Sequence, residues 1–182
     1  MNIQTLLRGK EYRFETKPGL FSKSEIDDGT KLLIDTMEIK PTSTVLDLGC
    51  GYGAIGIVAS DLATEGRVYM VDTDIRAVRY SRINAKINNV KNTLIKPSDG
   101  FEELEGILFD AVLSNPPSHL PKETLLEFIE DAKKQLTSEG KIYFVTEKRI
   151  RPLIQREFER VFGNYDAIAS KAQYVVSFAM QE

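Results

Sequence analysis

The sequence has little of the residues that build disulfide-bonded or metal-centred domains. It contains one cysteine, one histidine and no tryptophan among 182 residues. A single cysteine excludes an internal disulfide, and one cysteine with one histidine supplies too few ligands for a typical zinc site. We therefore expect no metal centre, and we expect Cys50, which stands between two glycines, to be a small buried residue.

Long apolar runs are also absent. No stretch approaches the roughly 18 apolar residues of a membrane helix, and the first ten residues lack the apolar core of a signal peptide. We expect a cytoplasmic protein without membrane contact. The net charge of −3 does not indicate a nucleic-acid binder, so any basic surface has to be local. Between residues 75 and 98 the chain has no acidic residue, and it carries Arg76, Arg79, Arg82, Lys86, Lys91 and Lys96.

What the chain does contain is the alternation of strands and helices typical of an α/β protein. Strands are predicted over 44–48, 67–72, 93–96, 109–114 and 141–146, with helices over 53–62, 74–88 and 122–136 and from about 150 to 162. Two last strands, near 165–170 and 173–180, are separated by a turn too short for a helical crossover. This order predicts a Rossmann-like, doubly wound sheet of about seven strands, mostly parallel with a C-terminal antiparallel hairpin.

The front of the chain is less regular. No element is predicted over 1–20, which ends in the turn signal Lys17-Pro18-Gly19, and a helix is predicted over 25–38 with Ser22 or Ser24 as its cap. We expect one domain over 1–182, with residues 1–40 as an N-terminal lid segment and helix before a Rossmann-like core over 41–182.

A glycine-rich motif follows the first core strand. Gly49, Gly51 and Gly53 indicate a turn in which the main chain approaches a ligand closely. Residues 51–56 also fit the dinucleotide fingerprint, with Asp72 about 20 residues on, so a nicotinamide-dependent oxidoreductase stays open. Asp47 at the strand end favours another ligand, because its carboxylate can accept hydrogen bonds from a cationic amino-acid group. With Asp47 the motif resembles that of class I S-adenosylmethionine-dependent methyltransferases, which implies S-adenosyl-L-methionine as cofactor.

Other polar segments follow the remaining parallel strands: Asp72, Ser98-Asp99, and the run 115–119. The carboxyl ends of parallel strands meet at one edge of the sheet, where open α/β folds bind ligands. At that edge Asp72 is suited to accept both ribose hydroxyls of a nucleoside, and Asp99 to accept from an adenine amino group.

Asn115-Pro116-Pro117 resembles the Asn-Pro-Pro-aromatic motif of methyltransferases that act on planar exocyclic or amide nitrogens. Such a nitrogen is a poor nucleophile because its lone pair is delocalised. The Asn115 side-chain oxygen and the Pro116 carbonyl, held in a stiff loop, can bind its two N–H groups and orient it for in-line transfer. Asn115 and Pro116 are therefore the predicted catalytic residues, and by position Asn115 also adjoins the cofactor.

Residues 17–22 and 26–33 resemble the segment that precedes the glycine motif in the small-subunit ribosomal RNA guanine-N2 methyltransferase family. The likeness spans essentially the whole chain but only the catalytic domain of the longer members, and it implies a single-domain homologue. By this resemblance Phe21, Asp27 and Gly29 line the methionine end of the cofactor. It implies methylation of guanine N2 in ribosomal RNA, with RNA or an assembling small subunit as partner, whereas a protein glutamine amide is the alternative acceptor.

One departure from that family concerns the substrate. Ser118 stands where the family has an aromatic residue, and it is followed by the expected His119. Pro117, Ser118 and His119 are predicted substrate-binding residues, with His119 touching the base or a phosphate, or only capping the next turn. The missing stacking face is predicted to come from Phe21, Phe101 or Tyr12. Composition and motifs leave the oligomeric state open.

Overall fold

The computed structural model describes residues 1–19 and 25–182. Its elements in chain order are β1 (Asn2–Leu7), β2 (Lys10–Glu15), α1 (Asp28–Thr36), β3 (Thr44–Leu48), α2 (Ala54–Leu62), β4 (Arg67–Asp72), α3 (Ile75–Ile87), β5 (Thr93–Pro97), η1 (Glu102–Leu104), β6 (Phe109–Ser114), α4 (Lys122–Gln135), β7 (Leu136–Glu147), η2 (Lys148–Ile150), α5 (Arg151–Phe162), β8 (Asp166–Lys171) and β9 (Tyr174–Met180).

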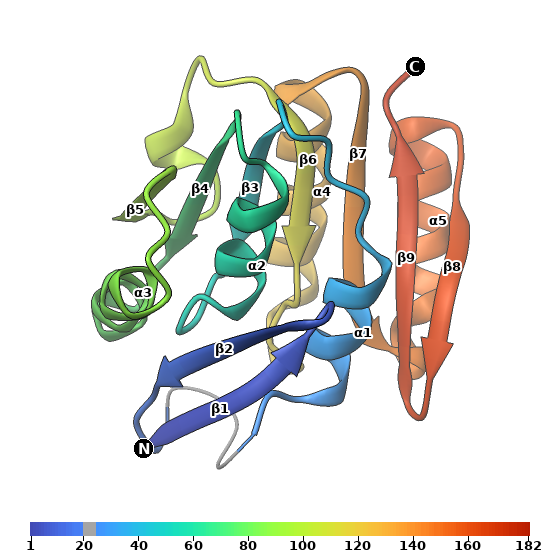
Figure 1. Cartoon of the computed structure of the whole chain (residues 1–182). Coiled ribbons are helices and arrows are strands. Elements are labelled where there is room, and N and C mark those ends of the chain that lie inside the picture. Colours follow the sequence, from blue (N-terminus) through green and yellow to red (C-terminus); the bar gives the residue numbers. More distant parts are fainter. Residues whose placement is uncertain (20–24) are drawn as a thin grey trace.

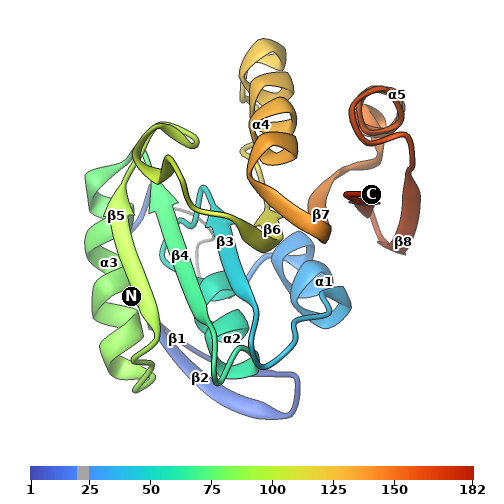
Figure 2. The same cartoon turned by 90° about the horizontal axis from the view of Figure 1, so that it is seen from above.

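The central sheet has seven strands in the order β5-β4-β3-β6-β7-β9-β8. The first five in this order pair in parallel, and β9 pairs antiparallel with both β7 and β8. Figure 1 shows the sheet with its helices, and Figure 2, seen from above, shows α4 and α5 on the side of the sheet opposite α1, α2 and α3. The predicted doubly wound fold with a C-terminal antiparallel hairpin is confirmed.

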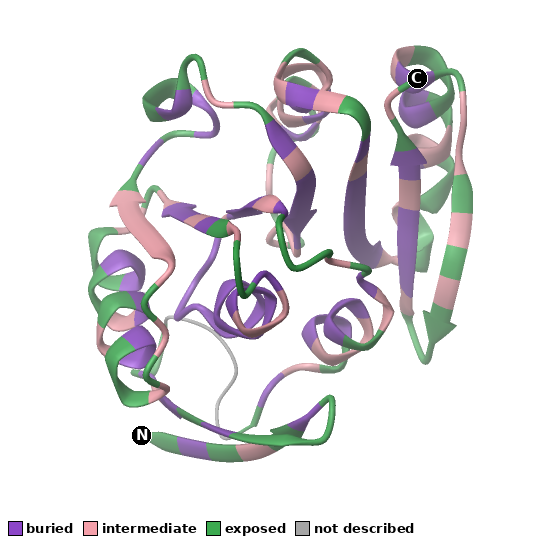
Figure 3. Cartoon of the chain, turned by 45° about the horizontal axis from the view of Figure 1, so that its top comes forward, coloured by how far each residue is buried: buried purple, intermediate pink, exposed green. Residues whose placement is uncertain are grey.

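Two apolar cores, one on each face of the sheet, follow from the two-residue period of a strand. In β3, Val45 packs toward α1, α2 and α3, whereas Leu46 and Leu48 pack toward α4 and α5. All three side chains are buried, and Figure 3 shows the buried residues concentrated in the central strands and on the inner sides of the helices. Because both faces are covered, the parallel strands read as nearly continuous apolar runs.

Helix α1 is shorter than the predicted helix over 25–38. It begins at Asp28, and its N-cap is Asp27, whose Oδ1 accepts from the backbone N–H of Thr30 at 2.9 Å. Ser22 and Ser24, the predicted caps, lie outside the described residues. The fifth core strand is longer than the predicted 141–146, because β7 begins directly after α4 and runs through Gly140.

The hairpin formed by β1 and β2 was not predicted. Its two-residue loop is Arg8-Gly9, and both residues have positive φ, 49° and 79°. Such turns usually carry Asn or Asp at the first position. Arg8 takes that place because its guanidinium caps the end of α1, donating to the carbonyls of Ile34 at 2.9 Å and Met37 at 3.3 Å. A tertiary contact therefore selects the turn residue.

Candidate functional site

The candidate site lies where the order of the strands reverses. Strand β3 pairs with β4 on one side and β6 on the other. The chain runs from β3 through β4 to β5 at one edge and then crosses back to β6, from which it builds the other half of the sheet. The polar segments singled out in the sequence all follow the carboxyl ends of β3, β4, β5 and β6. This is the crevice where doubly wound sheets bind ligands.

The glycine-rich loop after β3 is a tight turn fixed from the neighbouring strand. The N–H groups of Gly49 and Cys50 both donate to the Val71 carbonyl at 2.9 Å. Gly53, with φ of 98°, is the N-cap of α2, and a Cβ there would lie 2.8 Å from Met70 Cε. Both its conformation and its packing therefore require glycine. The loop brings the N-terminus of α2 to the crevice, where its partial positive charge favours an anionic group.

Helix α3 braces this loop from behind. Ser81 Oγ donates to the Gly51 carbonyl at 2.8 Å, and Asn84 Nδ2 donates to the Tyr52 carbonyl at 2.8 Å. Both side chains are fully buried. The face of α3 that packs inward thus consists of small and polar residues, and its basic row faces solvent.

Asp47 is placed differently from our expectation of a carboxylate open to a ligand. Its side chain is fully buried on the α2 side of the sheet, where Oδ2 accepts from the N–H of Gly56 at 2.8 Å. Oδ1 has no hydrogen-bond partner among the described residues. Burial, opposed by the Gly56 hydrogen bond and reinforced by the charge of Asp72, raises the pKa of Asp47 to about 7. Strand alternation turns this side chain inward, away from the crevice. Direct contact between Asp47 and a ligand therefore stays a prediction.

Asp72 and Asp99 face the first of two larger cavities. Asp72 ends β4, and its two oxygens accept from the N–H groups of Gly51 and Asp74, each at 2.9 Å, which fixes the carboxylate plane. The cavity has a volume of about 630 Å³. Its lining includes Gly49, Val71, Asp72, Ser98, Asp99, Gly100, His119, Leu120, Thr124 and Phe128. A mostly apolar cavity with two carboxylates suits a nucleoside.

Asn115 is oriented by the cap of α1. Its Nδ2 donates to Thr30 Oγ1 at 2.9 Å and to Asp27 Oδ1 at 3.2 Å, and Thr30 Oγ1 in turn donates to Asp27 Oδ2 at 2.7 Å. Because the amide nitrogen is engaged in this network, the side-chain oxygen is the group left to accept from a ligand. Asp27 thus positions Asn115, a role that the sequence did not reveal.

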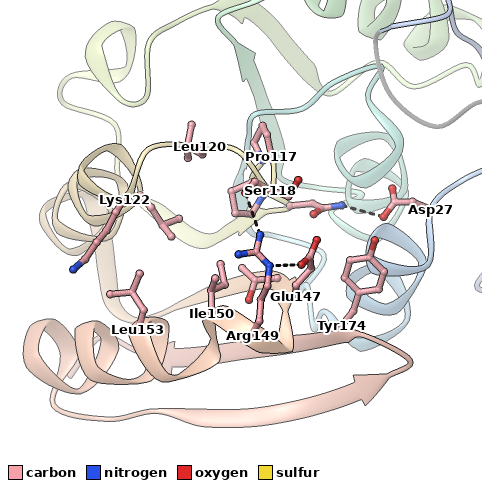
Figure 4. A pocket seen from close by; sticks show the side chains of 14 residues that line it. Asp27, Pro117, Ser118, Leu120, Lys122, Glu147, Arg149, Ile150, Leu153 and Tyr174 are labelled. Carbon is pink, nitrogen blue, oxygen red and sulfur yellow. Dashed lines mark hydrogen bonds and ion pairs between the residues drawn. The ribbon is translucent and has the colours of Figure 1, made fainter.

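Asn115 lines the second cavity, which has a volume of about 350 Å³ and lies on the other side of the Asn-Pro-Pro loop (Figure 4). Its described lining is Asp27, Asn115, Pro116, Pro117, Ser118, Leu120, Lys122, Leu125, Thr146, Glu147, Arg149, Ile150, Leu153 and Tyr174. Pro117, Ser118 and Leu120 line both cavities. The loop after β6 is therefore the shared wall at which two bound molecules would meet.

Of the three aromatic residues offered as a stacking face, Tyr12 and Phe101 do not fill that role in the described structure. Tyr12 is 2% exposed and stacks on Phe14 in the hairpin core. Phe101 is 7% exposed and packs edge-on against Phe109. Phe21 lies outside the described residues. His119 is exposed beside the first cavity rather than the second, and Gly29, at the start of α1, lines neither of the two larger cavities.

Sequence reasoning also missed several lining residues. Thr146 and Glu147 end β7, so the strand-end rule that selected Asn115 applied equally to them. Tyr174 gave no such signal, because it reaches the site only through the pairing of β9 with β7. Phe128 in α4 lines the first cavity and lies 2.8 Å from where a Cβ of Gly100 would be.

Two groups of basic residues bear on substrate binding, one on α3 and one beside the second cavity. In α3, Arg76 is engaged with Asp74 at 2.6 Å, and Arg82 donates to the Ile95 carbonyl at 2.7 Å. Beside the second cavity, Lys122 and Arg149 line the wall. Lys148 and Arg151 are exposed next to Arg149 in the turn that leads into α5. The second group is thus the one adjacent to the candidate acceptor site.

The described residues form neither a candidate metal cluster nor a membrane-crossing helix. Over 1–19 and 25–182 no cluster of three potential metal ligands occurs. In the same ranges every helix is too short or too polar to cross a bilayer.

The fold and site are those of a methyltransferase: a doubly wound sheet with a glycine-rich turn after β3, a carboxylate after β4 and Asn-Pro-Pro after β6. The family model for the methyltransferase small domain matches residues 11–177, and the chain belongs to this family. Membership decides for a methyltransferase and against the nicotinamide-dependent alternative.

Among its relatives is the uncharacterized protein YbxB of Bacillus subtilis, 32% identical over 173 residues that cover 93% of this chain and 86% of YbxB. Ribosomal RNA small subunit methyltransferase C of Haemophilus influenzae is 34% identical, over 87% of this chain and 48% of that protein. The solved T. thermophilus 16S rRNA N2 G1207 methyltransferase, in complex with AdoMet and guanosine, superimposes with a TM-score of 0.89 at 26% identity, over 100% of this chain and 50% of that one. The chain thus spans about half the length of the named ribosomal RNA methyltransferases that it matches.

Proposed function

We propose that this protein transfers a methyl group from S-adenosyl-L-methionine to the exocyclic N2 of a guanine in small-subunit ribosomal RNA. The observation that carries the proposal is the pair of cavities that share the loop following Asn115. One cavity has the carboxylates and apolar walls that a nucleoside needs, and the other opens on the Asn115 amide. A cytoplasmic location is part of the proposal.

The first cavity fits the nucleoside part of this cofactor. The Asp72 carboxylate would accept from the ribose hydroxyls, since each of its oxygens keeps a lone pair beside its backbone bond. Asp99 would accept from the adenine amino group, with Phe128 and Leu120 as apolar walls. Gly49, Gly51 and Gly53 would bring the main chain to the amino-acid end, and the unpartnered Asp47 Oδ1 lies behind them. Bound there, S-adenosyl-L-methionine supplies an electrophilic methyl group on a sulfonium.

The residues of the second cavity would orient the acceptor. The Asn115 oxygen and the Pro116 carbonyl would accept the two N–H bonds of the exocyclic amine and hold its nitrogen toward the first cavity. No side chain has to remove a proton beforehand, because the nitrogen becomes acidic only as the new N–C bond forms. The proton then leaves to water. Positioning and desolvation are thus the contributions of this site.

The relatives support guanine as the acceptor. One is named as a ribosomal RNA small subunit methyltransferase, and the solved T. thermophilus 16S rRNA N2 G1207 methyltransferase is in complex with guanosine. A glutamine amide presents the same planar nitrogen, and the Asn-Pro-Pro loop alone does not distinguish the two acceptors. The distinction has to come from the rest of the second cavity.

A transfer assay tests the proposal. The purified protein should methylate small ribosomal subunits, or their RNA, prepared from cells that lack it, and nuclease digestion with mass spectrometry should locate the label on N2 of one guanine. Subunits from wild-type cells, already modified, are the matched control and should accept little. Label on protein glutamine instead of RNA would reject the proposed acceptor.

RNA binding should depend on the basic residues beside the second cavity. Replacing Lys148 and Arg151 together by alanine is expected to weaken RNA binding. The slope of log affinity against log salt should become shallower by about 1.5, because phosphates that are no longer contacted keep their condensed counterions. The pair Arg79→Ala and Lys86→Ala, equal in charge but on α3, is the matched control. A larger loss from the α3 pair would assign the RNA path to the basic row of that helix.

A further inference from the structure

Tyr174 is the one aromatic side chain among the described residues that line the second cavity. It begins β9 and lies opposite Glu147 in the antiparallel pairing of β9 with β7. Figure 4 shows its ring at the side of the cavity, with the hydroxyl end directed toward Asp27. The residue is half-buried, so part of the ring is available to a ligand.

The ring is held by its surroundings. A Cβ added to Gly29 would lie 3.0 Å from Tyr174 Cδ1 and 3.1 Å from Cε1, so the glycine at the start of α1 leaves the room that the ring occupies. On the other side, the Lys148 N–H donates to the carbonyl of Gln173 at 2.7 Å, which fixes the backbone just before Tyr174. Gly29 therefore packs beside Tyr174 and Asp27, and its lining of the cofactor, expected from the resemblance, stays a prediction.

Polar groups line the same cavity as this ring. The Thr146 hydroxyl is buried without a hydrogen-bond partner among the described residues, and it lines the cavity together with the Glu147 carboxylate and the Asn115 amide. An unpartnered buried hydroxyl is costly unless a ligand completes it. A flat aromatic face with polar groups at its margin is the way in which proteins hold an unstacked base.

We infer that Tyr174 is the stacking platform for the acceptor base, held in place by Gly29, and that the Thr146 and Glu147 side chains face the edge of that base. The inference rests on the proposed function, which it makes more specific. A ring platform favours a nucleobase over a glutamine side chain, because only the base has a face to stack. It also supplies the aromatic contact that Ser118 does not make in the Asn-Pro-Pro loop.

Tryptophan fluorescence can test the platform directly, because the chain contains no tryptophan. In Tyr174→Trp the new indole is the sole tryptophan, and guanosine monophosphate added with S-adenosylhomocysteine should quench its emission in a saturable way. Tyr165→Trp is the matched control, since Tyr165 packs against Phe158 away from the cavity and should not respond. Equal quenching at both positions, or none at 174, would overturn the inference.

Transfer kinetics give the second readout. Tyr174→Ala should lower kcat/KM for unmodified ribosomal RNA about 10- to 100-fold, as expected for a lost base-aromatic stack, with the affinity for S-adenosylhomocysteine unchanged. Tyr174→Phe should keep near wild-type kinetics, and Gly29→Ala, which displaces the ring, should resemble Tyr174→Ala. If wild type methylates the RNA and Tyr174→Ala does so equally well, the platform is wrong and the proposed function stands. If wild type methylates a glutamine peptide and no RNA, the proposed function itself is wrong.

Discussion

Asn115→Ala is expected to slow methyl transfer to ribosomal RNA by about 10²- to 10³-fold, the usual loss when one preorganised polar contact to a reacting group is removed. The amide oxygen is the group that would hold the acceptor nitrogen, and the Asp27–Thr30 network fixes its direction. The fold should survive, because the half-buried Asn115 side chain follows β6 rather than lying within the sheet. Single-turnover rates at saturating RNA measure the effect.

Two further variants separate positioning from proton transfer. Asn115→Asp keeps an acceptor oxygen and should retain more activity than Asn115→Ala. Its transfer rate should gain no new pH dependence near neutral pH, because no base takes part in the transfer. Thr30→Val removes the hydroxyl that accepts from Asn115 at 2.9 Å. It should lower the transfer rate less than Asn115→Ala does, because Asp27 still accepts from the amide. A wild-type rate for Asn115→Ala would make the residue only part of a turn.

The parts of the site that could be predicted are those whose chemistry is local in sequence. Asp72 ends one strand and Asn115 directly follows another, so recognising the strands was enough to place both at one sheet edge. Tyr174 could not be found in this way, because its distance from Asn115 along the chain is closed only by the antiparallel pairing of β9. Residues that reach a site through tertiary pairing carry no mark in the sequence.

The N-terminal hairpin shows the same limit in the fold. Its strands carry the alternation of β-structure, with Tyr12 and Phe14 buried and Arg13 exposed. However, Arg8 of the turn caps α1. The strands are fixed by Asn84 of α3 and by Asn88 at its C-cap, which exchange hydrogen bonds with the backbone of β2. A hairpin whose turn and edge are stabilised by distant helices cannot be predicted from its local sequence.

Asp47 was predicted as a carboxylate that contacts a ligand, and in the structure its side chain is buried, which has a measurable consequence. The carboxyl group is 0% exposed, and its pKa of about 7 lies well above the ordinary 3.8, chiefly because burial disfavours the charged form. The folded protein therefore binds this proton more tightly than the unfolded chain does. The resulting stability is fully present below pH 4 and is lost as the pH rises through 7.

Comparing wild type with Asp47→Asn isolates the titration of Asp47 and its coupled neighbours, because groups that do not interact with Asp47 contribute equally to both proteins. In ligand-free protein the free energy of unfolding of wild type should fall, relative to the variant, by about 2–3 kcal/mol between pH 5 and pH 8. Urea unfolding at each pH measures the difference. Thr64→Ser, at an exposed residue without a titratable group, is the control and should show a constant difference over the same range. A constant difference for Asp47→Asn as well would mean that its carboxylate is solvated, as a direct contact with the amino-acid end of the cofactor would require.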